Sequence, residues 1–169
     1  MTGQASESTR QSDPTARLKA LVADTNVNDD TFLATDYLNH FNEIVMLLEM
    51  IPDMPDILED AREWQPKTYD QHFNDSGLSD SHITIEAYEN APKEFREPFD
   101  KTIERMNKVV ASSLKRIEAA MDSPQPEELI AATAAASRQL QRLIDIAAAI
   151  IHGDTPNLQQ VEIDDLLTC

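Results

Sequence analysis

The chain has 169 residues, of which 41% are hydrophobic and only 5% aromatic, and it contains 3 glycines. This composition disfavours β-sandwiches and barrels, and the length suits one domain with a substantial core. The net charge of −17 repels phosphate backbones and anionic lipids, so we expect neither nucleic acid nor a membrane as a partner.

The N-terminal third is expected to begin with a disordered segment and to continue into helices. Residues 1–13 are polar, whereas residues 14–23 have the spacing of a short helix. Residues 24–30 are rich in Asn and Asp, which predicts a linker. A long helix should then start at Asp30 or Thr31 and end before Pro52. Its apolar stripe consists of Leu33, Tyr37, Phe41, Ile44, Leu48 and Ile51.

The middle of the chain is predicted to contain shorter helices separated by irregular segments. Residues 55–64 and 82–90 have helical apolar spacing, whereas residues 65–80 are expected to be irregular. Another long helix should begin near Pro98, because proline is tolerated in a first turn. The stripe of this helix is Phe99, Ile103, Met106, Val110, Leu114, Ile117 and Met121.

The last predicted helix, residues 126–152, has the most regular pattern, with steps that alternate between four and three residues. Such a heptad seam is typical of packed helices, and Gly153 is the expected helix stop. The seam consists of Leu129, Thr133, Ala136, Leu140, Leu143, Ala147 and Ile150, and Ile130, Ile144 and Ile151 widen it. We therefore predict an all-α fold, an antiparallel helical bundle over residues 14–153 with three long helices. The bundle closes either within one chain or in a homodimer.

The only cysteine, Cys169, is the last residue and cannot form an internal disulfide. No basic start precedes an apolar run, and no stretch of eighteen apolar residues occurs. We therefore expect a cytoplasmic protein with neither a signal peptide nor a transmembrane segment.

A metal site is one candidate for chemistry in a helical bundle. His40 and Glu43 share a helix face with Asp36, but the Glu-x-x-His pattern of di-iron carboxylate proteins is absent. A phosphotransfer role for His40 lacks the flanking Lys-Gly of histidine phosphotransfer domains. We also find no nucleophile elbow, phosphate loop or dinucleotide fingerprint, so no cofactor is expected.

The C-terminal residues 154–169 are predicted to form a flexible tail with a short amphipathic helix. Residues 158–167, Leu-Gln-Gln-Val-Glu-Ile-Asp-Asp-Leu-Leu, resemble the N-terminal docking peptide of the flagellar motor switch protein. They are similar also to the C-terminal peptide of the chemotaxis phosphatase. Both families use the peptide to bind a phosphorylated CheY-like response regulator. The resemblance implies contact residues at Gln160, Glu162, Ile163, Asp164, Leu166 and Leu167.

Enzymatic function is a separate possibility, that of an aspartyl-phosphate phosphatase. The chain departs from the helical chemotaxis phosphatase, because the only acidic residue four positions before a glutamine is Glu7, in the N-terminal segment that is expected to be disordered. Asp100-Lys-Thr-Ile-Glu104-Arg-Met-Asn107 resembles the Asp/Ser-x-x-x-Glu-x-x-Asn motif of a second phosphatase family. That family's fold contains a sheet. The resemblance implies that Glu104 anchors the receiver and Asn107 orients a water. The first expectation is a non-enzymatic regulator or adaptor, with this phosphatase and a metal-binding bundle as alternatives.

Overall fold

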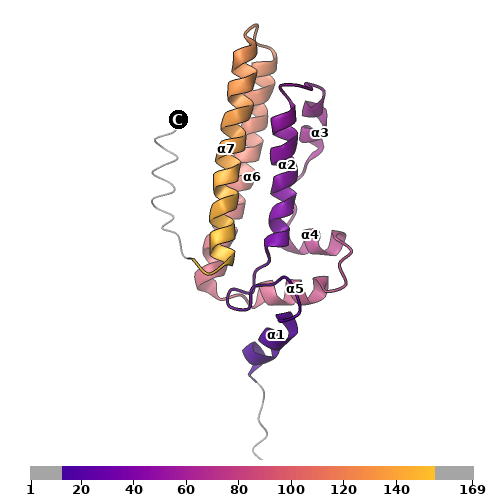
Figure 1. Ribbon diagram of the computed structural model, residues 1–169, viewed down its shortest axis with the longest axis vertical. Coiled ribbons are helices and arrows are strands. Elements are labelled where there is room, and N and C mark those ends of the chain that lie inside the picture. Colours follow the sequence, from indigo (N-terminus) through magenta and orange to yellow (C-terminus); the bar gives the residue numbers. More distant parts are fainter. Residues whose placement is uncertain (1–12, 155–169) are drawn as a thin grey trace, which may run out of the picture.

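A computed structural model describes residues 13–154, and within this range the chain folds into helices without a β-strand (Figure 1). The all-α prediction is confirmed. The elements are α1 (Pro14–Val22), the 3-10 turn η1 (Thr35–Leu38), α2 (Asn39–Met50), α3 (Ile57–Glu63), α4 (Tyr69–Asp75), α5 (Ser81–Glu89), α6 (Lys93–Met121) and α7 (Pro126–Ile151). The disorder predicted for residues 1–12 and the docking helix predicted after residue 154 lie outside the described residues.

The two longest described helices, α6 and α7, form an antiparallel hairpin. A connection of only four residues, 122–125, joins them, and they lie side by side along their length in Figure 1. Helix α2 packs along α7, and α3 packs against α2. Only α6 and α7 exceed 20 residues in the described part of the chain, whereas three such helices were predicted.

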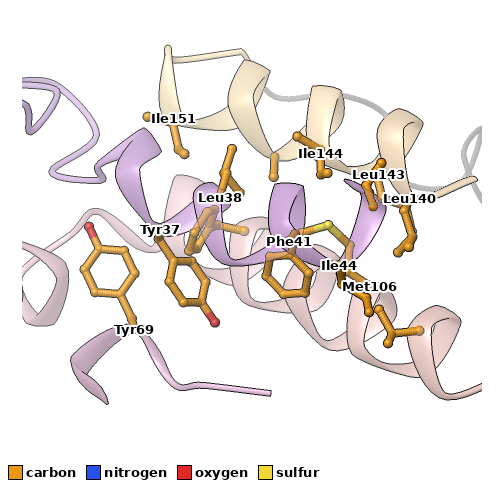
Figure 2. Close-up of a cluster of buried hydrophobic side chains, with 14 of the residues drawn as sticks. Tyr37, Leu38, Phe41, Ile44, Tyr69, Met106, Leu140, Leu143, Ile144 and Ile151 are labelled. Atoms are coloured by element: carbon orange, nitrogen blue, oxygen red, sulfur yellow. The ribbon is translucent and has the colours of Figure 1, made fainter. Parts of the chain in front are cut away.

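The predicted seam of α7 is the side of that helix that enters the core. Its positions from Thr133 to Ile150 are buried, and Leu129 is half-buried. Ile144 and Ile151 widen the buried stripe as predicted, but Ile130 is 56% exposed. Figure 2 shows Leu140, Leu143 and Ile144 of α7 on one side of α2, whose Phe41 and Ile44 lie between α7 and Met106 of α6.

The helix predicted from Asp30 or Thr31 begins later in the structure. Asn28 accepts hydrogen bonds through Oδ1 from the backbone N–H groups of Asp30 (2.9 Å) and Thr31 (3.0 Å), and Val27 pairs with Ala34 in an isolated bridge. Phe32 adopts a positive φ of 59°, which cannot continue a right-handed helix. These local bonds compete with helix formation, so α2 is preceded only by the turn η1.

The segment 65–80 was predicted to be irregular, and this is wrong for its centre, which forms α4. Thr68 is the N-cap, and its side chain accepts from the backbone of Gln71 at 3.2 Å. The Gln71 side chain accepts in return from the backbone of Thr68 at 2.9 Å. This reciprocal capping box stabilises the first turn. Tyr69 and Phe73 stand one turn apart in α4, and both are buried.

Two other predicted boundaries also change. Helix α6 begins at Lys93, five residues before Pro98, because Phe95 packs against the core one turn ahead of the buried Phe99. The described residues begin at Asp13, which was assigned to the disordered segment. Asp13 is the N-cap of α1 and accepts from the backbone of Thr15 at 3.1 Å. No helix in residues 13–154 has both the length and the apolar character needed to cross a membrane.

Candidate functional site

The segment that joins α3 to α4 is fastened to α2 by side chains, and this positions the candidate site. Tyr37 donates its hydroxyl to the carbonyl of Lys67 at 2.5 Å. His40 Nε2 donates to the carbonyl of Gln65 at 2.7 Å. The hydroxyl of Tyr69 accepts from the backbone N–H of Ala34 at 3.0 Å. These bonds hold residues 64–69 against the start of α2, next to the middle of α6.

The two residues proposed as metal ligands, His40 and Glu43, are not brought together with further ligands. His40 is buried, its Nε2 is used by Gln65, and its ring stacks on Trp64. Glu43 is exposed on the same helix. Between residues 13 and 154 there is no group of three or more His, Cys, Asp or Glu side chains that could hold a metal ion.

A hollow of about 300 Å³ lies between the segment 66–69, the aromatic core and α6. One wall consists of aromatic rings from η1, α4, α5 and α6, and the other consists of polar residues of α6. The lining residues are Tyr37, Pro66, Lys67, Thr68, Tyr69, Tyr88, Phe99, Asp100, Ile103, Glu104 and Asn107. All three polar members of the predicted phosphatase motif therefore line one cavity, at successive turns of α6.

The aromatic wall is continuous. Tyr69 stacks on Tyr88 with ring centroids 4.3 Å apart, and Tyr37 lies 5.2 Å from Tyr69. Phe99 completes the wall, 6.2 Å from Tyr37. Figure 2 shows the rings of Tyr37 and Tyr69 beside each other at the end of α2. Burial raises the pKa of both tyrosines, so their hydroxyls stay protonated at neutral pH.

Asp100 has defined partners at the rim of the hollow. It accepts a hydrogen bond from the hydroxyl of Tyr88 at 2.8 Å and pairs with Nε of Arg96 at 3.6 Å. The guanidinium of Arg96 lies 4.4 Å from the centroid of the Tyr88 ring. Burial and the neighbouring Asp100 raise the pKa of Tyr88 to about 12. The Tyr88 hydroxyl therefore remains a donor at physiological pH.

Glu104 and Asn107 differ in exposure. The Glu104 side chain is 67% exposed and pairs with Lys108 at 3.1 Å, a weak surface interaction. Asn107 is half-buried, and its Oδ1 is shielded from water without a hydrogen-bond partner among the described residues. An unpaired buried carbonyl oxygen costs roughly 1–3 kcal/mol. Asn107 therefore has an energetic reason to turn its amide toward a donor.

The residues of the predicted docking peptide lie outside the described part of the chain. This applies to Gln160, Glu162, Ile163, Asp164, Leu166 and Leu167. The described chain ends just past Gly153, whose φ of +101° stops α7 as predicted.

Sequence reasoning identified the polar wall of the hollow but not its aromatic wall. Tyr69 fell in a segment that was expected to be irregular, and Tyr88 was not singled out. The available signal was the Thr68-x-x-Gln71 capping box, followed by Tyr69 and Phe73 at helical spacing. Comparison of the chain with protein-family models, curated proteins and solved structures finds no match.

Proposed function

We propose that the protein is a helical regulator in a chemotaxis or two-component pathway, and that it docks a CheY-like response regulator through residues 158–167. The observation that carries this proposal is the sequence of that peptide, Leu-Gln-Gln-Val-Glu-Ile-Asp-Asp-Leu-Leu. Ile163, Leu166 and Leu167 stand at positions i, i+3 and i+4, the spacing of a short helix that places one face in a groove. The cytoplasm is the compartment in which this partner would be met.

The described residues support the separation of a folded body from a binding peptide. Its core is built from residues between Leu18 and Ile151, and α7 stops at the glycine cap before the peptide begins. A chain that ends at Gly153 would retain every residue of this core. We therefore expect the body to fold without the peptide, and the peptide to act as a separate binding element.

The physical chemistry of the peptide fixes what its binding should look like. Ordering about ten residues on a partner is costly, so the affinity should be on the order of micromolar. Glu162, Asp164 and Asp165 should make the complex weaker as the salt concentration rises. Truncation of Ile163 or Leu167 to alanine should weaken binding by about 1–3 kcal/mol, as expected for an apolar anchor.

The test is titration of phosphorylated receivers from the same host against the full chain and against a chain that ends at Gly153. Ile163→Ala in the full chain is the point variant, and Met54→Ala is its matched control, because Met54 is an exposed apolar residue of the body. Loss of binding with the truncation and with Ile163→Ala alone is the expected result. Equal binding by the full and shortened chains would end the proposal.

A second candidate function, aspartyl-phosphate phosphatase, is favoured by one observation. Asp100, Glu104 and Asn107 line a single hollow on α6. An amide that orients water on an acyl phosphate has to reach into the receiver, so Asn107 would have to turn outward from its shielded position. Phosphate release from a phosphorylated receiver, measured with Asn107→Ala and the full chain, decides this function. An equal rate with and without the protein would exclude it.

A homodimer is also proposed, with α7 as the contacting helix. Ile130, near the start of α7, is 56% exposed beside a second hollow that lies between α2 and α7. Packing of this side chain against a second copy would remove its apolar surface from water, which favours association. Light scattering after size exclusion should give twice the monomer mass for the wild type. Ile130→Asp should return the monomer, and a monomeric wild type would contradict the proposal.

A further inference from the structure

The hollow on α6 has a chemical character that the docking of a receiver does not use. Asp100, Glu104 and Asn107 stand at positions i, i+4 and i+7, so the helix directs them to one side. The aromatic rings of Tyr37, Tyr69, Tyr88 and Phe99 line the same hollow. Oxygen acceptors that face aromatic rings are the combination that recognises organic cations.

The chain already holds one cation of its own in this way. The Arg96 guanidinium lies over the face of Tyr88 and also pairs with Asp100. The attraction of a cation to an aromatic face is worth about 0.5–1 kcal/mol at exposed sites. Tyr37, Tyr69 and Phe99 are buried, so a ligand cation would meet the aromatic wall at the rim beside Tyr88.

Charge in and around the hollow also favours a cation. Glu104 is largely exposed and pairs with the flexible side chain of Lys108. The positive charge in the lining, Lys67, is offset by Asp75 at 3.1 Å. The whole chain carries a net charge of −17, which raises the local concentration of small cations.

Asn107 contributes an amide oxygen that lacks a hydrogen-bond donor among the described residues. Its Oδ1 has no partner within residues 13–154 and is closed off from water. If the side chain turned into the hollow, this oxygen could accept a hydrogen bond from a ligand N–H group. The cost of burying it without a partner would then be removed. An ammonium or guanidinium ligand brings several N–H donors, enough for Glu104 and Asn107 together.

We propose that this hollow binds a small organic cation, a primary amine or guanidinium compound, between the carboxylate of Glu104, the amide oxygen of Asn107 and the aromatic wall. A volume of about 300 Å³ is at the low end of ligand sites, so the ligand is small. Polyamines and agmatine-like compounds have the required size and charge. The proposed contacts of this site do not involve residues 158–167.

The experiment is calorimetric titration of the full-length protein with putrescine, spermidine and agmatine at constant ionic strength, followed by amide NMR. Saturable binding with shifts at the Asn107 side-chain amide and on residues around the hollow is expected. Glu104→Gln, which keeps the shape of the side chain, should weaken binding about tenfold, equivalent to about 1.4 kcal/mol. Asn107→Ala should weaken it as well.

Glu97→Gln is the matched control, because Glu97 is an exposed carboxylate of α6 outside the hollow. It should leave the affinity unchanged. Equal weakening by Glu97→Gln and Glu104→Gln would mean that the amines are only diffuse counterions of an acidic surface, and the proposal would fail. It fails too if none of the three amines binds while the NMR spectrum shows a folded protein.

Discussion

Trp64 and His40 are joined by two different contacts. Their rings stack with centroids 4.5 Å apart, and the Trp64 Nε1–H donates to the backbone carbonyl of His40 at 3.0 Å. His40 returns a bond to the next residue of the same segment, from its Nε2 to the carbonyl of Gln65. The end of α3 is thereby fixed to the first turn of α2, and the segment that forms one edge of the hollow follows directly.

Removal of the Trp64 donor should destabilise the protein measurably. Trp64→Phe keeps a ring but removes the hydrogen bond and part of the stacking surface, so we expect a loss of about 1–2 kcal/mol in the free energy of unfolding. Trp64→Ala should cost about 3–5 kcal/mol, because it opens a cavity in the core. Urea denaturation followed by far-ultraviolet circular dichroism measures both. A Phe variant as stable as the wild type would show that this bond contributes nothing.

The protein should lose stability as the pH falls below about 6.5. Burial lowers the pKa of His40 and of His72 from the ordinary value of 6.5, and Lys67 lowers it further in both cases. For His40, the hydrogen bond to the Gln65 backbone and the nearby Glu43 raise the pKa in part but do not reverse the shift. For His72, the hydrogen bond to the Asp36 backbone and the carboxylates of Asp36 and Asp75 act in the same way. Below pH 6.5 the unfolded chain binds protons that the folded chain does not. The free energy of unfolding therefore decreases as the pH falls.

Urea midpoints between pH 8 and pH 5.5 test this dependence. His72→Gln should reduce the slope of stability against pH, and His40→Gln should do the same. His82→Gln is the matched control, because His82 is exposed on α5. If the slope of stability against pH is unchanged in His40→Gln and His72→Gln but disappears in His82→Gln, the two buried histidines are not its cause.

The tyrosines should resist ionisation while the protein is folded. All three, Tyr37, Tyr69 and Tyr88, have a raised pKa through burial, and that of Tyr88 reaches about 12. Absorbance at the tyrosinate band should therefore not rise around pH 10, where an unfolded control titrates. Stability should fall above pH 10, since only the unfolded chain releases these protons. A midpoint near 10 in the folded protein would refute the prediction.

The side chain of Thr68, which caps α4 at the edge of the hollow, should contribute to the stability of the fold. Thr68→Ala removes the side chain that accepts from Gln71, and the expected loss is about 0.5–2 kcal/mol. Thr68→Ser retains the oxygen and should recover most of that loss. Urea denaturation of both variants provides the measurement. Identical stability of the Ala and Ser variants would mean that the capping box is not a stabilising feature.

The parts of the fold that followed from sequence are those where periodicity and packing agree. In α7 the apolar steps run without interruption, and the buried face is the one that was predicted. In the region of Leu33 and Tyr37 the same spacing was misleading. There the side chain of Asn28 and the positive φ of Phe32 create a loop whose apolar residues are buried without being helical. Local hydrogen bonds outweighed the periodic pattern.

The candidate site was half predictable for a similar reason. Asp100, Glu104 and Asn107 belong to one helix, so their spacing along the chain fixes their shared face. Tyr37, Tyr69 and Tyr88 come from three elements and meet only after the chain has folded. The sequence of one chain does not indicate that residues this far apart will line the same side of a hollow.

The hydroxyl of Thr31 donates to the carbonyl of Ile151 at 2.6 Å, across 120 residues of sequence. During biosynthesis this donor is made long before its acceptor. At about 5–20 residues per second, Thr31 waits on the order of 6–24 s for Ile151 to be added. Thr31 is fully buried in the finished protein, so through that interval the loop around it has no final place to occupy. The loop around Thr31 is therefore among the last parts of the described chain to be buried, and until then its apolar residues would be exposed to a chaperone.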